Sequence, residues 1–303
     1  MNIFASMSEA NVINQRIIPP SELIINQDSS IYHIKLREEH IADNVIIVGD
    51  QDRVELISSF FDNIEAKIQS REFVTHVGEY KGKRITVMST GIGTDNIDIA
   101  INELDAAVNI NLETRQIKET KRKLNIIRIG TSGTLQEDIP VDSYLLSEYG
   151  LGLDGLMYHY GFQHSKEEQE IINAYSDQVT QNSNLPSPYI VKASETLFNK
   201  LRTPEMHTGI TATASGFYGP QGRALRLKPI NSILNEELTA FSLNQHRITN
   251  FEMETSALFG FGKLLDHNCV TVCAIIANRI RKEYSKDYKK TIKELVEVVI
   301  ENL

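Results

Sequence analysis

The apolar positions of the chain alternate between two patterns. Unbroken apolar runs such as Val45–Val48 predict buried strands, whereas apolar residues spaced three or four apart, as between Ile97 and Val108, predict helices. By the same criteria we expect further strands at 83–89, 124–129, 143–149, 207–215 and 269–277, and further helices at 54–61, 167–179 and 292–299.

Strands that alternate with helices indicate an α/β fold. We therefore expect a single domain with a central mixed β-sheet flanked by helices, and candidate ligand-binding residues at the carboxyl ends of its strands. Residues 1–30, which contain Pro19-Pro20, are expected to form an N-terminal extension, and residues 31–303 the domain itself. Ile31–Leu36 is expected to be a short strand or arm, and 184–188 a surface loop within the domain.

Composition limits the kind of protein. The chain has 303 residues, 41% of them hydrophobic and 23% charged, which is ordinary for a globular protein. A net charge of −9 argues against nucleic-acid binding, and no apolar run approaches the roughly 18 residues of a membrane helix. Cys269 and Cys273 form no metal-like set, and the N-terminus has no signal-peptide core, so we expect a reduced, cytoplasmic protein.

The strand around Arg128 leads into Gly130-Thr131-Ser132-Gly133. We expect a tight turn there, in which glycines allow close approach of a ligand and Arg128 offers a guanidinium to an anion. The stretch alone is equally compatible with an ordinary turn and a solvated Arg128. A second strand–glycine–helix junction, Gly49 to Arg53, is a common anion site, although Asp50 or Asp52 could simply cap the helix.

Two glycines, Gly91 and Gly93, follow the strand at 83–89 as they would in a dinucleotide-binding motif. The third glycine of that motif is replaced by Asn96, so a nicotinamide cofactor is disfavoured.

A glycine-rich loop from Gly216 to Arg223 combines an aromatic ring, an amide and a guanidinium in Phe217, Gln221 and Arg223. A flat heterocycle needs such a set, although a turn with one buried aromatic ring is an equal alternative. Farther on, we expect Glu252 and Glu254 to enter a helix. At that spacing the two carboxylates would point in different directions and serve separate purposes, one of them buried.

Taken together, these stretches resemble the nucleoside phosphorylase-I family, and within it the enzymes that cleave uridine. The resemblance runs from Ile31 to the C-terminal helix. It rests on six ordered motifs: Gly49-Asp50-x-x-Arg53, Ser70-Arg71-Glu72-Phe73, Ser89-Thr90-Gly91-Ile92-Gly93, Arg128-Ile129-Gly130-Thr131, Phe217-Tyr218-x-x-Gln221-x-Arg223 and Glu252-Met253-Glu254.

The resemblance implies reversible phosphorolysis of uridine to uracil and ribose 1-phosphate, with phosphate as co-substrate and no cofactor. It implies catalytic roles for Arg223, Gln221 and Glu254, which would stabilise the leaving uracil anion and the cationic ribose. The implied binding residues are Gly49, Arg53, Arg71, Arg128 and Thr131 for phosphate, His33, Met253 and Glu254 for ribose, and Phe217, Gln221, Arg223, Ser132 and Gly133 for the base.

The resemblance also implies shared active sites. Arg71 and His33 would reach into the site of a neighbouring subunit, so at least a homodimer is expected, and the family suggests a hexamer of three dimers. No metal is expected in the site. Some relatives hold a monovalent cation at the dimer interface with Glu72 and a serine, and the asparagine at that position, Asn96, makes this cation doubtful here.

Three alternative functions can be compared with uridine phosphorolysis. Purine-cleaving relatives place an aspartate after the last core strand, where this chain has Asn278-Arg279, which disfavours a purine or broad specificity. Nucleosidases of this fold lack the phosphate arginines, whereas Arg53, Arg71 and Arg128 are all present. A non-catalytic nucleoside-binding protein would have lost at least one catalytic residue, and the sequence shows no such loss.

Overall fold

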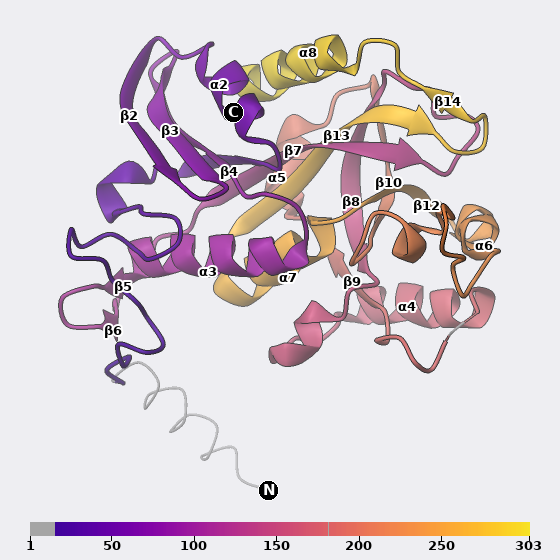
Figure 1. Cartoon of the computed structure of the whole chain (residues 1–303), viewed down its shortest axis with the longest axis horizontal. Helices are drawn as coiled ribbons and strands as arrows, with labels where there is room; N and C mark the ends of the chain where they lie inside the picture. The colour runs from indigo at the N-terminus through magenta and orange to yellow at the C-terminus, as the bar shows by residue number, and fades with distance from the viewer. Residues whose placement is uncertain (1–15, 181) are drawn as a thin grey trace, which may run out of the picture.

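One twelve-stranded mixed sheet organises the computed structural model, which describes residues 16–180 and 182–303 (Figure 1). Its strands follow the order β11-β12-β10-β8-β13-β7-β1-β4-β3-β2, with β9 added beside β8 and β14 beside β13. The expected single α/β domain with a mixed sheet is confirmed. The strands are β1 (Asn44–Val48), β2 (Asn63–Ser70), β3 (Phe73–Tyr80), β4 (Lys83–Ser89), β7 (Asn125–Thr134), β8 (Tyr144–Gly152), β9 (Tyr189–Lys192), β10 (Met206–Thr213), β11 (Ser242–Leu243), β12 (His246–Glu252), β13 (Asn268–Asn278) and β14 (Glu283–Tyr284).

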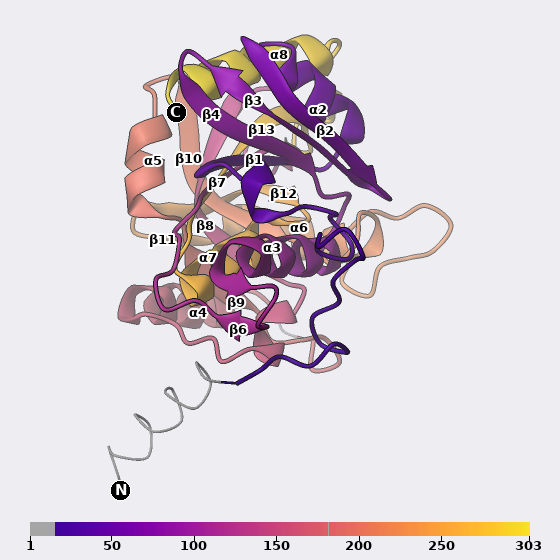
Figure 2. The ribbon, with the colours of Figure 1, turned by 90° about the vertical axis from the view of Figure 1, so that its left-hand side faces the viewer.

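Helices cover the sheet, and a two-stranded hairpin, β5 (Ile110–Asn111) with β6 (Gln116–Ile117), stands apart from it. Both Figure 1 and Figure 2 place α2 and α8 near β2 and β3, and α4 at the opposite end of the molecule. The helices are η1 (Glu38–His40), α2 (Gln51–Ser58), α3 (Thr94–Asn109), η2 (Leu156–His159), α4 (Lys166–Gln178), α5 (Glu195–Leu201), η3 (Gly219–Gln221), α6 (Leu234–Ala240), α7 (Thr255–Leu265) and α8 (Tyr288–Glu301).

Half of the sheet closes on itself. Strand β12 pairs in parallel with β10 and also antiparallel with β7, where Asn250 faces Thr134 and Phe251 faces Gly133. Because β7, β13, β8 and β10 are already joined in that order, this extra pairing completes a ring of strands. The pairing brings the carboxyl end of β12 beside the carboxyl end of β7, two segments that are distant in sequence.

The apolar positions that predicted the elements form the core. Val45–Val48 of β1 is buried, as are the inward residues of α3 and α8, such as Leu104 and Leu295. One large apolar cluster lies around β1, β4, β7 and β13, and a second lies around β8, β10 and β12. No helix within the two described ranges is long and apolar enough to span a bilayer.

Of the two forms expected for Ile31–Leu36, a short strand or an arm, the strand is wrong. Ile31 makes a single isolated bridge with Ile25, and the chain then turns, with Lys35 at a positive φ of 53°. The amide of Lys35 donates to the carbonyl of Ile31, and the amide of Ile31 donates to the carbonyl of Leu36. Ile31, Ile34 and Leu36 of this loop are nonetheless buried, because they pack into the large core cluster.

The segment that precedes this loop is anchored to the hairpin β5–β6. The amide of Ile18 donates to the carbonyl of Arg115 at 2.9 Å, and the guanidinium of Arg115 donates back to the carbonyl of Ile18, also at 2.9 Å. Leu23 reaches the core and is 8% exposed. Residues 16–30 thus lie against the rest of the fold, and residues 1–15 lie outside the described range.

Candidate active site

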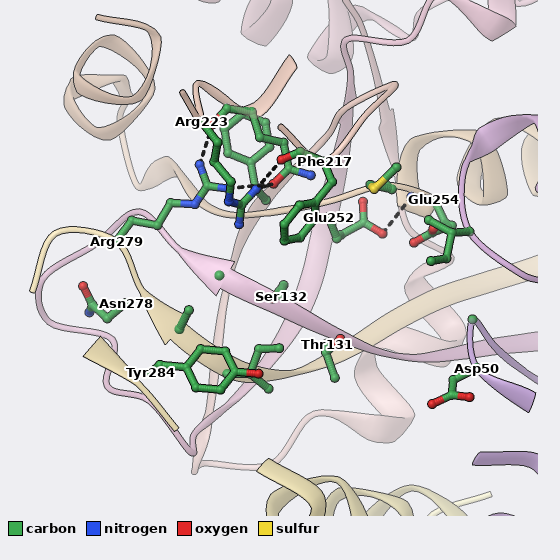
Figure 3. A pocket seen from close by; sticks show the side chains of 18 of the residues that line it. Asp50, Thr131, Ser132, Phe217, Arg223, Glu252, Glu254, Asn278, Arg279 and Tyr284 are labelled. Carbon is green, nitrogen blue, oxygen red and sulfur yellow. Dashed lines mark hydrogen bonds between the residues drawn. The ribbon is translucent and has the colours of Figure 1, made fainter. Parts of the chain in front are cut away.

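A cavity of about 1180 Å³ lies where the carboxyl ends of β1, β7, β12 and β13 come together. In Figure 3, Phe217, Arg223 and Arg279 gather at one end of it, Glu254 and Asp50 lie toward the other, and Thr131 and Ser132 lie along the strand between them. The cavity is lined by all of the predicted site residues except Arg71 and His33: Gly49, Arg53, Arg128, Thr131, Ser132, Gly133, Phe217, Gln221, Arg223, Met253 and Glu254.

The predicted turn at Gly130–Gly133 does not form. Strand β7 continues through these residues to Thr134, because β13 runs parallel beside it and pairs with it as far as Asn278. Gly130 serves another purpose. The side chain of Arg128 folds back over it, so that a Cβ atom at position 130 would lie 2.2 Å from Nη1 of Arg128. The glycine therefore provides the space in which the guanidinium lies.

Two buried carboxylates hold that guanidinium. Nη1 of Arg128 lies 3.1 Å from Oε2 of Glu252, and Nη2 donates to Oε2 of Glu254. The prediction that these glutamates enter a helix and point apart is wrong: Glu252 ends β12, and α7 begins at Thr255. The turn between the two elements directs both carboxylates at Arg128.

Glu252 also organises the start of α7. Its carboxylate accepts hydrogen bonds from the amides of Glu254 and Thr255 and from the hydroxyl of Thr213. A carboxylate in this position satisfies amides that have no partner within the helix. Sequence reasoning gave Glu252 no site role, although its place at the carboxyl end of a strand was the signal that could have identified it.

The charges of this group depend on each other. Burial raises the pKa of Glu254, as does neighbouring Glu252, whereas Arg128 and the amide of Gly93, which donates to Oε1 at 2.7 Å, act in the opposite direction. Burial alone would lower the pKa of Arg128, but Glu254 and Glu252 raise it above the ordinary arginine value. Arg128 is therefore a permanent cation at the floor of the cavity.

A second guanidinium faces the same end. Arg53, in the first turn of α2, donates from Nη1 to the carbonyl of Ile129 at 3.1 Å. Its pKa is lowered first by burial and then by the positive charge of Arg128. Two neighbouring cations that repel each other form a site that favours an anion. Asp50 caps α2 with its side chain, and Gly49 and Thr131 line the cavity beside the two arginines.

The opposite end of the cavity carries an aromatic ring, an amide and two further guanidinium groups. Arg223 stacks on the ring of Phe217, with Cζ 3.8 Å from the ring centroid, and donates from Nη1 to Oε1 of Gln221 at 2.5 Å. Nη2 of Arg279 donates to the same oxygen at 2.6 Å. Because Oε1 receives both guanidinium groups, the amide is oriented so that Nε2 is the end that can meet a ligand.

Arg279 was not predicted as a site residue. It directly follows β13, and burial together with the charge of Arg223 lowers its pKa to about 9. Its Nε atom is buried without a hydrogen-bond partner. Its neighbour Asn278 has a structural role, since its side chain donates to the carbonyls of Gln136 and Ile139 and accepts from the amides of Ile280 and Arg281.

Ser132 is partly committed to the protein interior. Its hydroxyl accepts from Nδ2 of Asn250 at 2.9 Å, across the pairing of β7 with β12. The same asparagine accepts from the hydroxyls of Thr211 and Thr249, so a buried chain of polar side chains supports the centre of the cavity. Gly133 lies next to Arg279, whose Nε would be 3.5 Å from a Cβ atom at that position.

Arg71 and His33 lie outside the cavity but close to each other. Arg71 occupies the turn between β2 and β3 with a positive φ of 55°, and its guanidinium lies over the ring of Tyr32. His33 follows Tyr32 and donates from Nδ1 to Oε1 of Glu103 at 2.5 Å. In the described part of the chain, no group of three or more histidine, cysteine, aspartate or glutamate side chains is arranged to hold a metal ion.

The chain is similar in sequence to known phosphorylases. Residues 43–302 match the family model of the phosphorylase superfamily. Uridine phosphorylase of Thermococcus kodakarensis is 31% identical over 84% of this chain and 79% of its own length. A purine nucleoside phosphorylase of the DeoD type from Alkaliphilus metalliredigens is 34% identical, but over 38% of this chain and 44% of its own length.

Two solved phosphorylase structures also superpose on this chain. A nucleoside phosphorylase from Trypanosoma brucei, described as showing uridine phosphorylase activity, superposes with a TM-score of 0.85 and 29% identity over 93% of this chain and 99% of its own. A uridine phosphorylase from the oomycete Phytophthora capsici superposes with a TM-score of 0.69 and 20% identity over 92% and 95%. The second likeness concerns the fold alone.

Proposed function

Because the chain belongs to the phosphorylase superfamily, we propose that it catalyses the reversible phosphorolysis of uridine to uracil and ribose 1-phosphate. One observation carries the proposal: a single cavity joins a buried arginine pair, Arg53 and Arg128, to an amide held by two further arginines. The first group suits phosphate, and the second suits a base that leaves with negative charge on its carbonyl oxygens.

The reaction needs no side-chain nucleophile. A phosphate oxygen forms a bond to C1′ of the ribose while the bond from C1′ to N1 of uracil breaks, and N1 retains the electron pair. Phosphate bound by Arg53 and Arg128, together with Gly49 and Thr131, would lie in line for this attack. Glu254 would oppose the positive charge that develops on the ribose, with Met253 beside it.

The departing uracil carries negative charge. We propose that Gln221 donates to a uracil carbonyl from Nε2, and that Arg223 and Arg279 supply positive charge at that edge. Phe217, Ser132 and Gly133 would border the ring. Proton uptake by the uracil anion then completes the reaction without a cofactor, and nothing in this scheme uses a metal ion.

The purine alternative is less well supported. A purine base is helped to leave by protonation of its imidazole ring, and an asparagine cannot supply that proton. Here Asn278 is in addition fully engaged with backbone groups of the loops at 136–139 and 280–281. The purine nucleoside phosphorylase of Alkaliphilus metalliredigens matches 38% of this chain, whereas the uridine phosphorylase of Thermococcus kodakarensis matches 84%.

We further propose a homo-oligomer with shared sites, at least a dimer and, by family pattern, a hexamer of three dimers. Exposed Arg71 and half-buried His33 both contact Tyr32 on a surface outside their own cavity, which supports their delivery to the phosphate and ribose of a neighbouring subunit. We also propose that the protein acts in pyrimidine salvage, which would follow from uridine phosphorolysis. A cytoplasmic location is proposed as well, and the two free, buried thiols of Cys269 and Cys273 support it.

The decisive experiment is an assay of free base release from uridine, thymidine and inosine, each with and without inorganic phosphate. We expect uracil release from uridine that depends on phosphate, and slow or absent hypoxanthine release. Release from uridine without phosphate would indicate a nucleosidase, a preference for inosine would indicate a purine phosphorylase, and binding of uridine without any release would indicate a non-catalytic protein.

A further inference from the structure

The surface that carries Arg71 and His33 is built around Tyr32. The Cζ atom of Arg71 lies 5.5 Å from the centroid of the Tyr32 ring, within the range of a cation–π interaction, and its Nη2 atom donates to the Tyr32 hydroxyl at 3.4 Å. The His33 ring meets the same tyrosine edge to face, with centroids 4.7 Å apart. One exposed side chain therefore contacts both predicted ligand-binding residues.

This surface is fixed to the fold from both sides. On one side, the carboxylate of Glu103 in α3 accepts from the amides of His33 and Ile34 and from Nδ1 of His33. A carboxylate acceptor places the proton on Nδ1, so that Nε2 of the neutral ring remains an acceptor. On the other side, Gln51 at the mouth of the cavity donates from Nε2 to the carbonyl of Arg71 at 3.0 Å.

An arginine in an exposed turn would ordinarily sample many side-chain conformations, and ordering it on binding opposes affinity. The ring and hydroxyl of Tyr32 restrict those conformations before any ligand is present. They also tie the position of Arg71 to the loop that carries His33. The two groups that the proposed function assigns to phosphate and to ribose are thus held as one unit.

We propose that Tyr32 is a positioning residue for phosphorolysis: it holds Arg71 in the orientation in which a neighbouring subunit's phosphate meets it. This inference rests on the proposed function and on its shared sites. It assigns to Tyr32 no contact with substrate, and it predicts an effect on phosphate binding that passes entirely through Arg71.

The test is a double-mutant cycle with Tyr32→Phe and Arg71→Ala in the full-length protein. We expect Tyr32→Phe to raise KM for phosphate about two- to tenfold, the range for loss of one hydrogen bond, with KM for uridine unchanged. In the Arg71→Ala background the same substitution should change KM for phosphate no further. Because Tyr32 is 37% exposed and the ring is retained, the variant should fold normally.

Tyr80→Phe is the matched control. Tyr80 also has a cation over its ring, Lys81 at 5.1 Å, and its hydroxyl donates to Glu301. It differs from Tyr32 in that the cation it contacts is not a predicted phosphate-binding residue. The control should leave KM for phosphate at the wild-type value.

Three results would overturn the inference. An unchanged KM for phosphate in Tyr32→Phe would remove Tyr32 from phosphate binding. An equal rise with and without Arg71 would show that Tyr32 does not act through Arg71, and the proposed function stands in both cases. If Arg71→Ala leaves KM for phosphate unchanged in an enzyme that still consumes phosphate, the inference and the shared phosphate site are both wrong. An enzyme inactive with uridine and phosphate would instead remove the proposed function itself.

Discussion

The guanidinium of Arg128 lies directly over the α-carbon of Gly130, so closely that a Cβ atom on that residue would be 2.2 Å from Nη1 and 2.9 Å from Cζ. Arg128 is buried beneath the cavity and held by Glu252 and Glu254, so it cannot move aside without breaking two charged contacts. A glycine in a strand interior weakens the strand, and here the close approach of the side chain accounts for it.

Gly130→Ala should therefore disable the enzyme by displacing Arg128. We expect kcat/KM for phosphate to fall by at least about 100-fold, since a charge-assisted contact and its alignment are lost together. Steady-state kinetics and a thermal melt would measure both effects. Gly161→Ala is the control, because a Cβ atom there meets no atom within 4 Å. Wild-type kinetics in Gly130→Ala would show that Arg128 does not need its present position.

Arg53→Met should separate phosphate binding from stability. The substitution keeps most of the aliphatic stem but removes a cation whose pKa is lowered by burial and by Arg128. We expect KM for phosphate to rise at least about tenfold, because a hydrogen bond to a charged group contributes roughly 1.5–3 kcal/mol. The melting temperature without phosphate should not fall, since a repulsion is relieved. A lower melting temperature with an unchanged KM would mean that Arg53 is structural.

The activity should decrease in acid because of Glu254. Burial raises the pKa of this carboxyl above its ordinary value of 4.5, so protonation begins at a higher pH than for an exposed glutamate. The protonated form cannot oppose positive charge on the ribose, so kcat should fall as the pH is lowered through that raised pKa. A pH–kcat profile would show this limb in the wild type, and Glu254→Gln should have a lower, flat kcat over the same range. The same limb in the variant would assign it to another group.

Arg279→Met should reduce leaving-group stabilisation while sparing the fold. The charge of Arg279 is disfavoured in the folded protein, as its lowered pKa of about 9 shows, so its removal should leave the melting temperature unchanged or higher. We expect kcat/KM for uridine to fall at least about tenfold, with KM for phosphate little changed. Arg223→Met offers a comparison on the same Gln221 oxygen. Unchanged uridine cleavage in both variants would exclude the base site proposed for this end of the cavity.

Local sequence determined most of the elements and several parts of the site. The apolar run Val45–Val48 and the junction that follows it required only near neighbours in the chain, and β1, the Asp50 cap and α2 form as that pattern predicts. The loop from Phe217 to Arg223 likewise contains its own stacking and hydrogen-bonding partners within seven positions. Such contacts can be predicted from sequence spacing, because residues so near in the chain are close in space whatever the tertiary structure.

The tertiary structure decided how those parts meet. Strand β12 pairs with β7, and this pairing turns Glu252 and Glu254 toward Arg128, where helical spacing predicted that they would diverge. Strand β13 extends β7 through the expected turn and brings Arg279 to the oxygen of Gln221. Arg128 and Glu254, for example, are 126 positions apart in sequence. The geometry of such contacts follows from the register of the sheet. Register is set by burial across the whole sheet, which no local pattern encodes.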